Sequence, residues 1–387
     1  MNEKKNAGLR STIGVMSLFF FANFVLLITP AMASIAEQFQ VSNATVALAS
    51  TICSLANVPS SLISGAIAGK KVRYKTLAML SAVLCLAGGL LASFAKTFTG
   101  LLVTRAVLGI GAGLGTPLPN AIIPQLYDEK KSAQLQGIGT TAMNLFGIFF
   151  QLIGGWACAL SLKYLWLSHA IMIIPLVLIP FIKEPERTAE QEEEKKSVGK
   201  LPFRAYLIAV GFGIMFMAVY PFLINMSAVV AKYGHSASVA GTITSTYTIG
   251  GMIAGVVFGK VFNIFKKFTN AACLVLLGLT LLLAYFGQAS LPVLFAASFL
   301  CGFGIWMMWP GTYMEFGEIM PPELVPVASG VFVASNGICG FLSSPYMAAV
   351  AKISGSDDPS MVFLFSAVIC LLLAVIRAVG KINRKNA

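Results

Sequence analysis

Arg105 is a charged side chain inside a long run of apolar residues. A guanidinium can bind an anionic group of a substrate, relay charge, or pair with backbone carbonyls and amide side chains. Insertion of a centred Arg into a bilayer costs about 2.5–3.5 kcal/mol, so such a residue normally has a partner. No Asp or Glu is expected at the depth of Arg105. The sequence leaves open a substrate-binding or charge-relaying cation, a structural pairing, and snorkelling to the interface.

Uncharged polar residues recur within other apolar runs at helical spacing. Ser50, Ser54, Asn57 and Ser61 follow one another at i, i+4, i+7 and i+11, which places them on one helical face. Close helix packing explains the Ser and Gly positions, whereas mid-run amides need several hydrogen-bond partners and predict a shared polar cavity. The predicted substrate-binding residues are Asn23, Asn57, Arg105, Asn144, Gln151, Tyr220, Asn225, Tyr247, Trp306 and Asn336.

Aromatic residues crowd one of these runs, where Trp306, Trp309 and Tyr313 surround Pro310. Aromatic packing is one interpretation. The other is a stacking wall for a flat or apolar substrate, because a proline inside a helix frees a backbone carbonyl and kinks the helix.

Side chains that could carry a coupling proton are scarce. Glu315 and Glu318 fall at the inner end of the tenth span, Glu37 at an outer helix end and His169 in the outer half of the sixth span. All four are interpreted as interfacial, so proton coupling stays open. Opposite charges in the predicted cytoplasmic layer suggest an inner gate that closes when the carrier faces outward. The predicted gating residues are Lys70, Arg73, Lys75, Glu315, Glu318 and Glu323.

Several other chemistries lack the residues that they need. The seven cysteines fall in apolar runs without a CxxC pair, so neither a zinc site nor a disulfide is expected. No GxxxxGK[ST] nucleotide-binding loop occurs. The sequence therefore predicts no enzyme, no metal and no cofactor.

The elements that must position these residues are membrane-spanning helices. Of 387 residues, 57% are hydrophobic and only 11% are charged, whereas soluble domains carry about 25% charged residues. Apolar runs of about 20 residues match the length of a helix that crosses a bilayer. We expect an all-α membrane protein with twelve spans, at about 11–33, 43–68, 76–95, 99–122, 134–158, 163–182, 205–230, 239–262, 268–287, 292–314, 324–351 and 360–379.

The net charge of +12 follows the same topology. With the N-terminus inside, the predicted cytoplasmic segments hold 22 of the 27 Lys and Arg residues, which is the positive-inside pattern. We expect a multi-pass protein of the cell membrane with both termini cytoplasmic, surrounded by lipid and monomeric. The charge asymmetry accounts for the basic excess, so no nucleic-acid partner is predicted.

The chain divides into two halves of equal length. The polar segment 183–204 has six basic and six acidic residues and is predicted to be a cytoplasmic linker between six-helix bundles at 1–182 and 205–387. Gly109 and Gly111 recur as Gly302 and Gly304 at an offset of 193. An even number of spans per half preserves orientation, so the halves are expected to be parallel repeats related by a pseudo-twofold axis.

These motifs resemble those of the major facilitator superfamily of bacterial secondary transporters. Arg105 precedes a matching Gly-x-Gly run, and the glycine and basic residues from Gly65 to Lys75 resemble the signature between spans two and three. Gly69 stands where that signature has its acid, and the Gly-Pro of the antiporter signature is absent from the region of Gly154. The resemblance implies twelve helices in two bundles, and it associates Arg105 with coupling or substrate.

We therefore predict a secondary transporter that moves a small organic solute by alternating access. A lone embedded cation among amides favours a small organic anion, with proton coupling undecided. The alternative is an exporter of neutral or amphiphilic drug-like compounds. A membrane enzyme or a channel would not require the matched glycine-rich spans.

Overall fold

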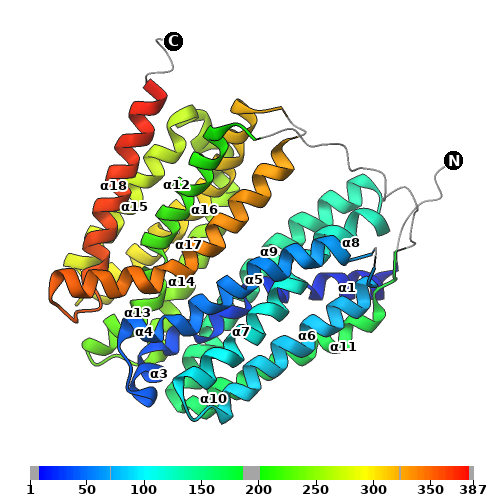
Figure 1. The fold of residues 1–387 in the computed structure, drawn as a ribbon, viewed down its shortest axis with the longest axis horizontal. Helices are drawn as coiled ribbons and strands as arrows, with labels where there is room; N and C mark the ends of the chain where they lie inside the picture. The colour runs from blue at the N-terminus through cyan, green and yellow to red at the C-terminus, as the bar shows by residue number, and fades with distance from the viewer. Residues whose placement is uncertain (1–7, 70, 186–200, 322–323, 383–387) are drawn as a thin grey trace. The chain divides into compact units, whose positions relative to one another are not determined.

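The computed structural model describes residues 8–69, 71–185, 201–321 and 324–382. Within these ranges the chain forms helices joined by short turns, with an isolated bridge between Ala68 and Val72 and no strand (Figure 1). Long apolar runs favour helices in lipid because a helix satisfies all of its backbone hydrogen bonds internally.

Eleven stretches among the described residues are long and apolar enough to cross a membrane. The longest, Ala237–Phe286, contains two helices, α14 (Ala237–Phe265) and α15 (Thr269–Phe286), joined by the three-residue turn η6 (Lys266–Phe268). This division brings the spans to twelve, and the predicted twelve-helix fold is confirmed.

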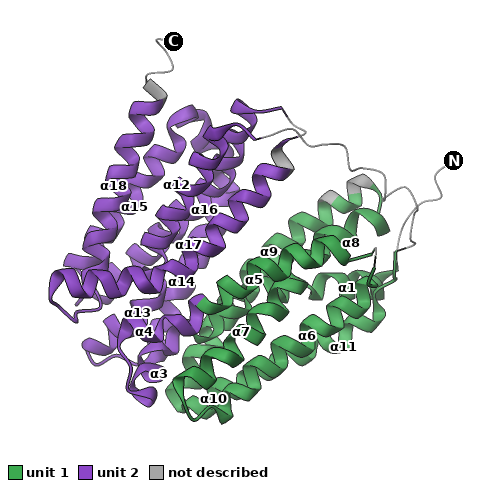
Figure 2. Ribbon diagram, viewed as in Figure 1, with its two compact units in different colours: residues 1–28, 52–194 green, residues 29–51, 195–387 purple. Residues whose placement is uncertain are grey.

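The helices group into two compact units, residues 1–28 with 52–194 and residues 29–51 with 195–387 (Figure 2). Unit 1 contains α1 (Leu9–Ser17), α2 (Phe20–Asn23), α6 (Tyr74–Leu90), η2 (Leu91–Phe94), α7 (Phe98–Gly115), α8 (Leu118–Leu126), α9 (Glu129–Leu160), α10 (Leu162–Leu167), η3 (Ser168–Met172), α11 (Ile173–Leu178) and η4 (Ile179–Phe181). Unit 2 contains α3 (Met32–Phe39), α4 (Asn43–Val46), α12 (Phe203–Val219), α13 (Pro221–Lys232), α14, η6, α15, α16 (Leu291–Ile319), α17 (Val325–Ser354) and α18 (Met361–Ile382).

Two further helices, η1 (Phe24–Ala31) and α5 (Leu48–Ile67), each contain residues of both units. Residues 29–51, from the last residues of η1 to the first residues of α5, are grouped with the C-terminal part of the chain. The predicted division into 1–182, 183–204 and 205–387 stays a prediction, and residues 186–200 of the predicted linker lie outside the described residues.

Glycines set the closest helix approaches in both units. A Cβ placed on Gly109 of α7 would lie 2.6 Å from the carbonyl oxygen of Cys53 in α5. The repeat-related Gly302 of α16 abuts the carbonyl oxygen of Tyr247 in α14 in the same way. Small residues let helix backbones approach closely, so matching glycines position matching helix pairs.

The N-terminus of α6 is capped by the carboxylate of Glu184, a residue more than 100 positions further along the chain. Glu184 accepts hydrogen bonds from the backbone N–H of Tyr74 at 2.6 Å and of Lys75 at 3.1 Å. A carboxylate at a helix N-terminus satisfies free N–H groups and complements the helix dipole. Lys75 Nζ donates to the carbonyl oxygen of Pro180 at 3.1 Å, which ties the same two segments together.

Candidate functional site

The buried charge of unit 1 has a partner. Arg105 on α7 is 0% exposed, and its Nη1 lies 3.3 Å from Nε2 of His169, which is also 0% exposed. Because a guanidinium only donates hydrogen bonds, Nε2 must be the acceptor. The sequence predicted no partner for Arg105, and the structure shows that His169 of η3 is one.

The remaining contacts of His169 fix its tautomer. Its Nδ1 lies 3.2 Å from the carbonyl oxygens of both Leu165 and Trp166. A carbonyl oxygen only accepts, so Nδ1 carries the hydrogen and the ring that accepts from Arg105 is neutral. The unit thus keeps the positive charge of Arg105 without a carboxylate among these contacts.

Packing holds the imidazole in this orientation. The ring of Phe24 meets it edge-on at 5.4 Å between centroids, and the ring of Trp166 stacks at 6.0 Å. A Cβ on Gly89 of α6 would overlap the imidazole, so only glycine leaves room for the ring there.

The interpretation of His169 as an interfacial residue is wrong. Its position near the outer part of an apolar run suggested solvent contact, but the rotation of η3 directs the ring into unit 1, where it is fully buried. Gly89, a glycine inside an apolar run, was the sequence signal that could have indicated a bulky neighbour.

Asn23 of α2 contacts α9, the helix that also carries the predicted amides Asn144 and Gln151. Asn23 Nδ2 donates to the carbonyl oxygen of Met143 at 3.0 Å, next to Asn144, and a Cβ on Gly147 would touch the Asn23 side chain. One turn further on, Gln151 is fully buried and its Nε2 donates to the carbonyl oxygen of Gly147 at 3.1 Å. Asn57 on α5 is half-buried and lies opposite Gly113 of α7.

The predicted residues of unit 2 lie on several helices. Tyr220, between α12 and α13, exchanges a hydrogen bond of 3.0 Å with Ser50 of α5. Tyr247 of α14 and Trp306 of α16 belong to one helix pair, in which Trp306 packs against Gly251. Asn336 on α17 is half-buried, and its Oδ1 is buried without a hydrogen bond to any described residue. A cavity shared by all ten predicted residues stays a prediction.

The aromatic residues of α16 join a network around Phe332, which is fully buried on α17. Trp309 meets Phe332 edge-on at 4.8 Å, and Tyr313 does so at 5.6 Å. Phe212 of α12 contacts both Phe332, at 4.7 Å, and Trp309, at 5.6 Å. Trp306 lies 5.9 Å from Trp309 and, like it, remains half-buried. The rings thus pack on one another and still present partly exposed faces.

Unit 2 has a largely buried ion pair that no sequence pattern indicated. Arg377 Nη1 of α18 donates to Glu315 Oε2 of α16 at 3.0 Å, and Arg377 Nη2 donates to the carbonyl oxygen of Ile208 at 3.3 Å. Glu315 is 7% exposed, so its interpretation as interfacial is wrong. Arg377 falls inside the predicted span 360–379, and α18 (Met361–Ile382) places it within a helix.

The other predicted gating residues have mixed positions. Arg73 and Glu318 are exposed, whereas Lys75 is half-buried and bonded to Pro180. Lys70 and Glu323 lie outside the described residues. The gate stays a prediction. Among the described residues, no group of three His, Cys, Asp or Glu could hold a metal ion.

Membrane-length helices that pack closely at glycines and enclose polar side chains are typical of an integral membrane protein with many spans. The sequence profile of the Major Facilitator Superfamily matches residues 13–226 and 206–385. The chain belongs to this superfamily of transporters.

Relatives and solved structures agree with this assignment. The multidrug resistance protein MdtL of Escherichia coli is 24% identical over 95% of this chain and 97% of its own length. The multidrug transporter protein MdtP of Bacillus subtilis is 27% identical over 26% of this chain, a match that spans only 18% of MdtP. The nucleoside transporter NupG has a TM-score of 0.76 at 14% identity, covering 96% of this chain and 99% of NupG. A D-xylose-proton symporter has a TM-score of 0.74 at 16% identity, covering 95% and 96%. At these identities the two structures show the fold alone.

Proposed function

We propose that this protein is a secondary transporter of the cell membrane that exports neutral or amphiphilic organic compounds by alternating access, with both termini in the cytoplasm. The observation that carries the proposal is the enclosure of Arg105. Its guanidinium is fully buried and directed at His169, so the group on which an anion site depends is already engaged within unit 1.

Two further observations support an apolar substrate. The half-buried faces of Trp306, Trp309 and Tyr313 offer rings on which a flat or apolar solute can stack. The relatives MdtL and MdtP are described as multidrug proteins. Neutral amides such as Asn336 add hydrogen-bonding capacity without imposing a charge on the solute.

A small organic anion is the second candidate, and one observation favours it. The contacts of His169 indicate a neutral imidazole, so its hydrogen bond to Arg105 does not itself neutralise the guanidinium charge. A conformation that releases the guanidinium from His169 would present a cation to a carboxylate.

Counterflow in proteoliposomes separates the two candidates. We expect saturable exchange of a labelled neutral amphiphile, with no competition from small carboxylates, and retention of that exchange in Arg105→Lys. Carboxylate exchange that is lost in Arg105→Gln and restored in Arg105→Lys would instead identify an anion carrier. Efflux of the labelled compound from proteoliposomes with an imposed proton gradient tests coupling to a proton. An ionophore that collapses the gradient should slow this efflux if the two are coupled.

A further inference from the structure

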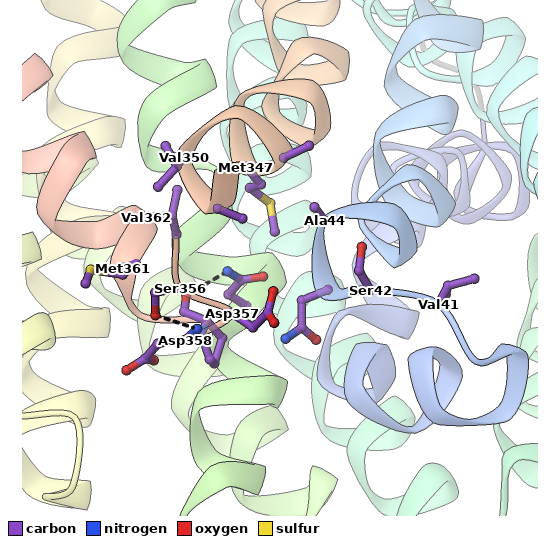
Figure 3. A pocket seen from close by; sticks show the side chains of 15 residues that line it. Val41, Ser42, Ala44, Met347, Val350, Ser356, Asp357, Asp358, Met361 and Val362 are labelled. Atoms are coloured by element: carbon purple, nitrogen blue, oxygen red, sulfur yellow. Dashed lines mark hydrogen bonds between the residues drawn. The ribbon is translucent and has the colours of Figure 1, made fainter. Parts of the chain in front are cut away.

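A cavity of about 470 Å³ opens in unit 2 where three loops and helix ends meet. The segment before α5 contributes Ser42 and Ala44, α13 contributes Asn225, and the turn between α17 and α18 contributes Asp357 and Asp358 (Figure 3). Ser344 of α17 donates to the carbonyl oxygen of Ala44, which fixes one wall to the next. In the predicted topology all of these elements lie on the outer face.

The two carboxylates of this cavity differ in how they are compensated. Asp358 Oδ2 forms an ion pair of 2.8 Å with Lys232 Nζ, and Asp358 Oδ1 accepts from the N–H and the hydroxyl of Ser360 at 3.0 and 2.8 Å. Burial raises the pKa of Asp358, but these hydrogen bonds outweigh it and hold the pKa below its ordinary value. Asp358 is therefore a structural anion whose charge Lys232 neutralises.

Asp357 is left as the uncompensated charge. Its exposed carboxylate has no hydrogen bond or ion pair with a described residue, and no Lys or Arg lines the cavity. In Figure 3 its side chain diverges from that of Asp358 and is directed toward the segment with Ser42 and Ala44. A carboxylate without a protein partner favours a cationic ligand.

A second acceptor comes from a nearly buried amide. Asn225 is 4% exposed, and its Nδ2 donates to the carbonyl oxygen of Pro359 at 2.8 Å. This hydrogen bond holds the amide in place while its Oδ1 accepts nothing from the described residues. An ammonium group carries three donors and no acceptor, which suits a carboxylate and an amide oxygen together.

The rest of the wall is apolar and sets the size of the ligand. Met347, Val350, Met361 and Val362 line it, together with Ala348. A volume of about 470 Å³ is within the range of small-molecule sites, about 300–1,000 Å³. A divalent metal is a poor fit, because Ca²⁺ takes about 6–8 oxygen ligands and Asp358 is already paired.

We propose that this cavity binds a protonated primary amine with an apolar substituent, its ammonium on Asp357 and Asn225 Oδ1 and its substituent against Met347 and Val362. The inference goes beyond the proposed export function and does not depend on it, since binding to the cavity can be measured without transport.

Calorimetric titration of the full-length protein in detergent tests the proposal, with micelles alone as the blank. The probe is 2-phenylethylammonium, the neutral match is 2-phenylethanol, and the anionic match is 3-phenylpropionate. We expect saturable binding of the ammonium compound at least tenfold tighter than that of the alcohol, and none of the carboxylate. Raised salt should weaken binding, because the carboxylate is exposed.

Matched variants locate the site. Asp357→Asn should weaken the amine at least tenfold, whereas Glu37→Gln, which removes an exposed charge elsewhere in unit 2, should change it less than twofold. Ala348→Trp should fill the cavity and abolish binding. Thermal melts without ligand check that each variant folds. Equal binding of amine and alcohol, an equal effect of Glu37→Gln, or no binding by the unaltered protein would overturn the proposal.

Discussion

Arg105 and Arg377 are two arginines within helices, one in each unit, and they are accommodated in opposite ways. Arg105 is fully buried against a neutral imidazole. Arg377 keeps 14% of its side chain exposed and is paired with the carboxylate of Glu315. The pair in unit 2 is electrically neutral, whereas the pair in unit 1 retains a positive charge. The two arginines therefore differ in the charge of the partner that each contacts, a neutral imidazole for Arg105 and a carboxylate for Arg377.

Repeat-related helices show the same contrast on a common scaffold. Gly109 of α7 and Gly302 of α16 both press against a backbone carbonyl of the neighbouring helix. At an offset of 193 from Arg105, α16 has Ser298, whose hydroxyl donates to the carbonyl oxygen of Ile243 at 2.7 Å. The packing of the two units is alike, and their charges differ.

The largest loss of stability is expected at the two glycines that set the matching helix contacts, Gly109 and Gly302. Gly109→Ala and Gly302→Ala should each lower stability by about 3 kcal/mol, because overpacking forces the backbones apart. Thermal unfolding in detergent measures the loss. Gly65→Ala and Gly255→Ala are matched controls, since a Cβ at either position meets nothing within 4 Å. Equal melting of Gly302→Ala and Gly255→Ala would show that the close approach does not matter.

The next largest effect is expected at His169, which accepts the hydrogen bond from Arg105. His169→Phe should cost about 2 kcal/mol, because hydrogen bonds to charged groups contribute about 1.5–3 kcal/mol. His169→Gln retains an acceptor and should lose less. The melting temperatures of both variants and of Arg105→Gln measure the effect. If Phe and Gln were equally tolerated, the hydrogen bond from Arg105 would contribute nothing measurable.

The ion pair between Glu315 and Arg377 should stabilise the folded protein less than the hydrogen bond between Arg105 and His169 does. A double-mutant cycle with Glu315→Gln and Arg377→Gln should give a coupling of about 1–2 kcal/mol, between the values for exposed and buried pairs. Unfolding of the two single variants and the double variant supplies the cycle. A coupling near zero would mean that the carbonyl oxygen of Ile208 alone holds Arg377.

The smallest effect is expected at Lys232 and Asp358. The pKa of Asp358 is lowered, so its pairing stabilises the folded protein fully above about pH 4 and is lost as the pH falls through the lowered value. Asp358→Asn should cost less than about 1 kcal/mol at neutral pH, because the pair is partly exposed. Its cost should shrink toward acid pH in melts, and a pH-independent cost would contradict the assignment.

The sequence was sufficient for the spans and for the glycine contacts. Apolar length is a local property, and a glycine that recurs at a fixed offset needs no tertiary information, so α7 and α16 were predicted as matching spans. Which helix each of them approaches at Gly109 and Gly302 is visible only in the structure. The rotation of a helix about its axis is set by its neighbours. For this reason His169 was placed at an interface when it faces the interior.

The ion pair between Glu315 and Arg377 was missed for a related reason. Basic residues near the C-terminus follow the positive-inside pattern, which counts charges but does not say which of them lie within a helix. The charge count therefore did not indicate that Arg377 pairs with another helix, and Glu315 was not assigned its partner. Glu184 belongs to a segment with many charges, and no sequence pattern indicates which of its carboxylates caps the N-terminus of α6.

The short turn between α14 and α15 has a mechanical consequence. Lys266–Phe268 is the whole connection, and three residues reach at most about 10 Å when extended. Neither helix can slide far along the other, because η6 limits how far the end of α14 and the start of α15 can separate. An axial displacement of α14 must therefore carry the adjoining end of α15 with it.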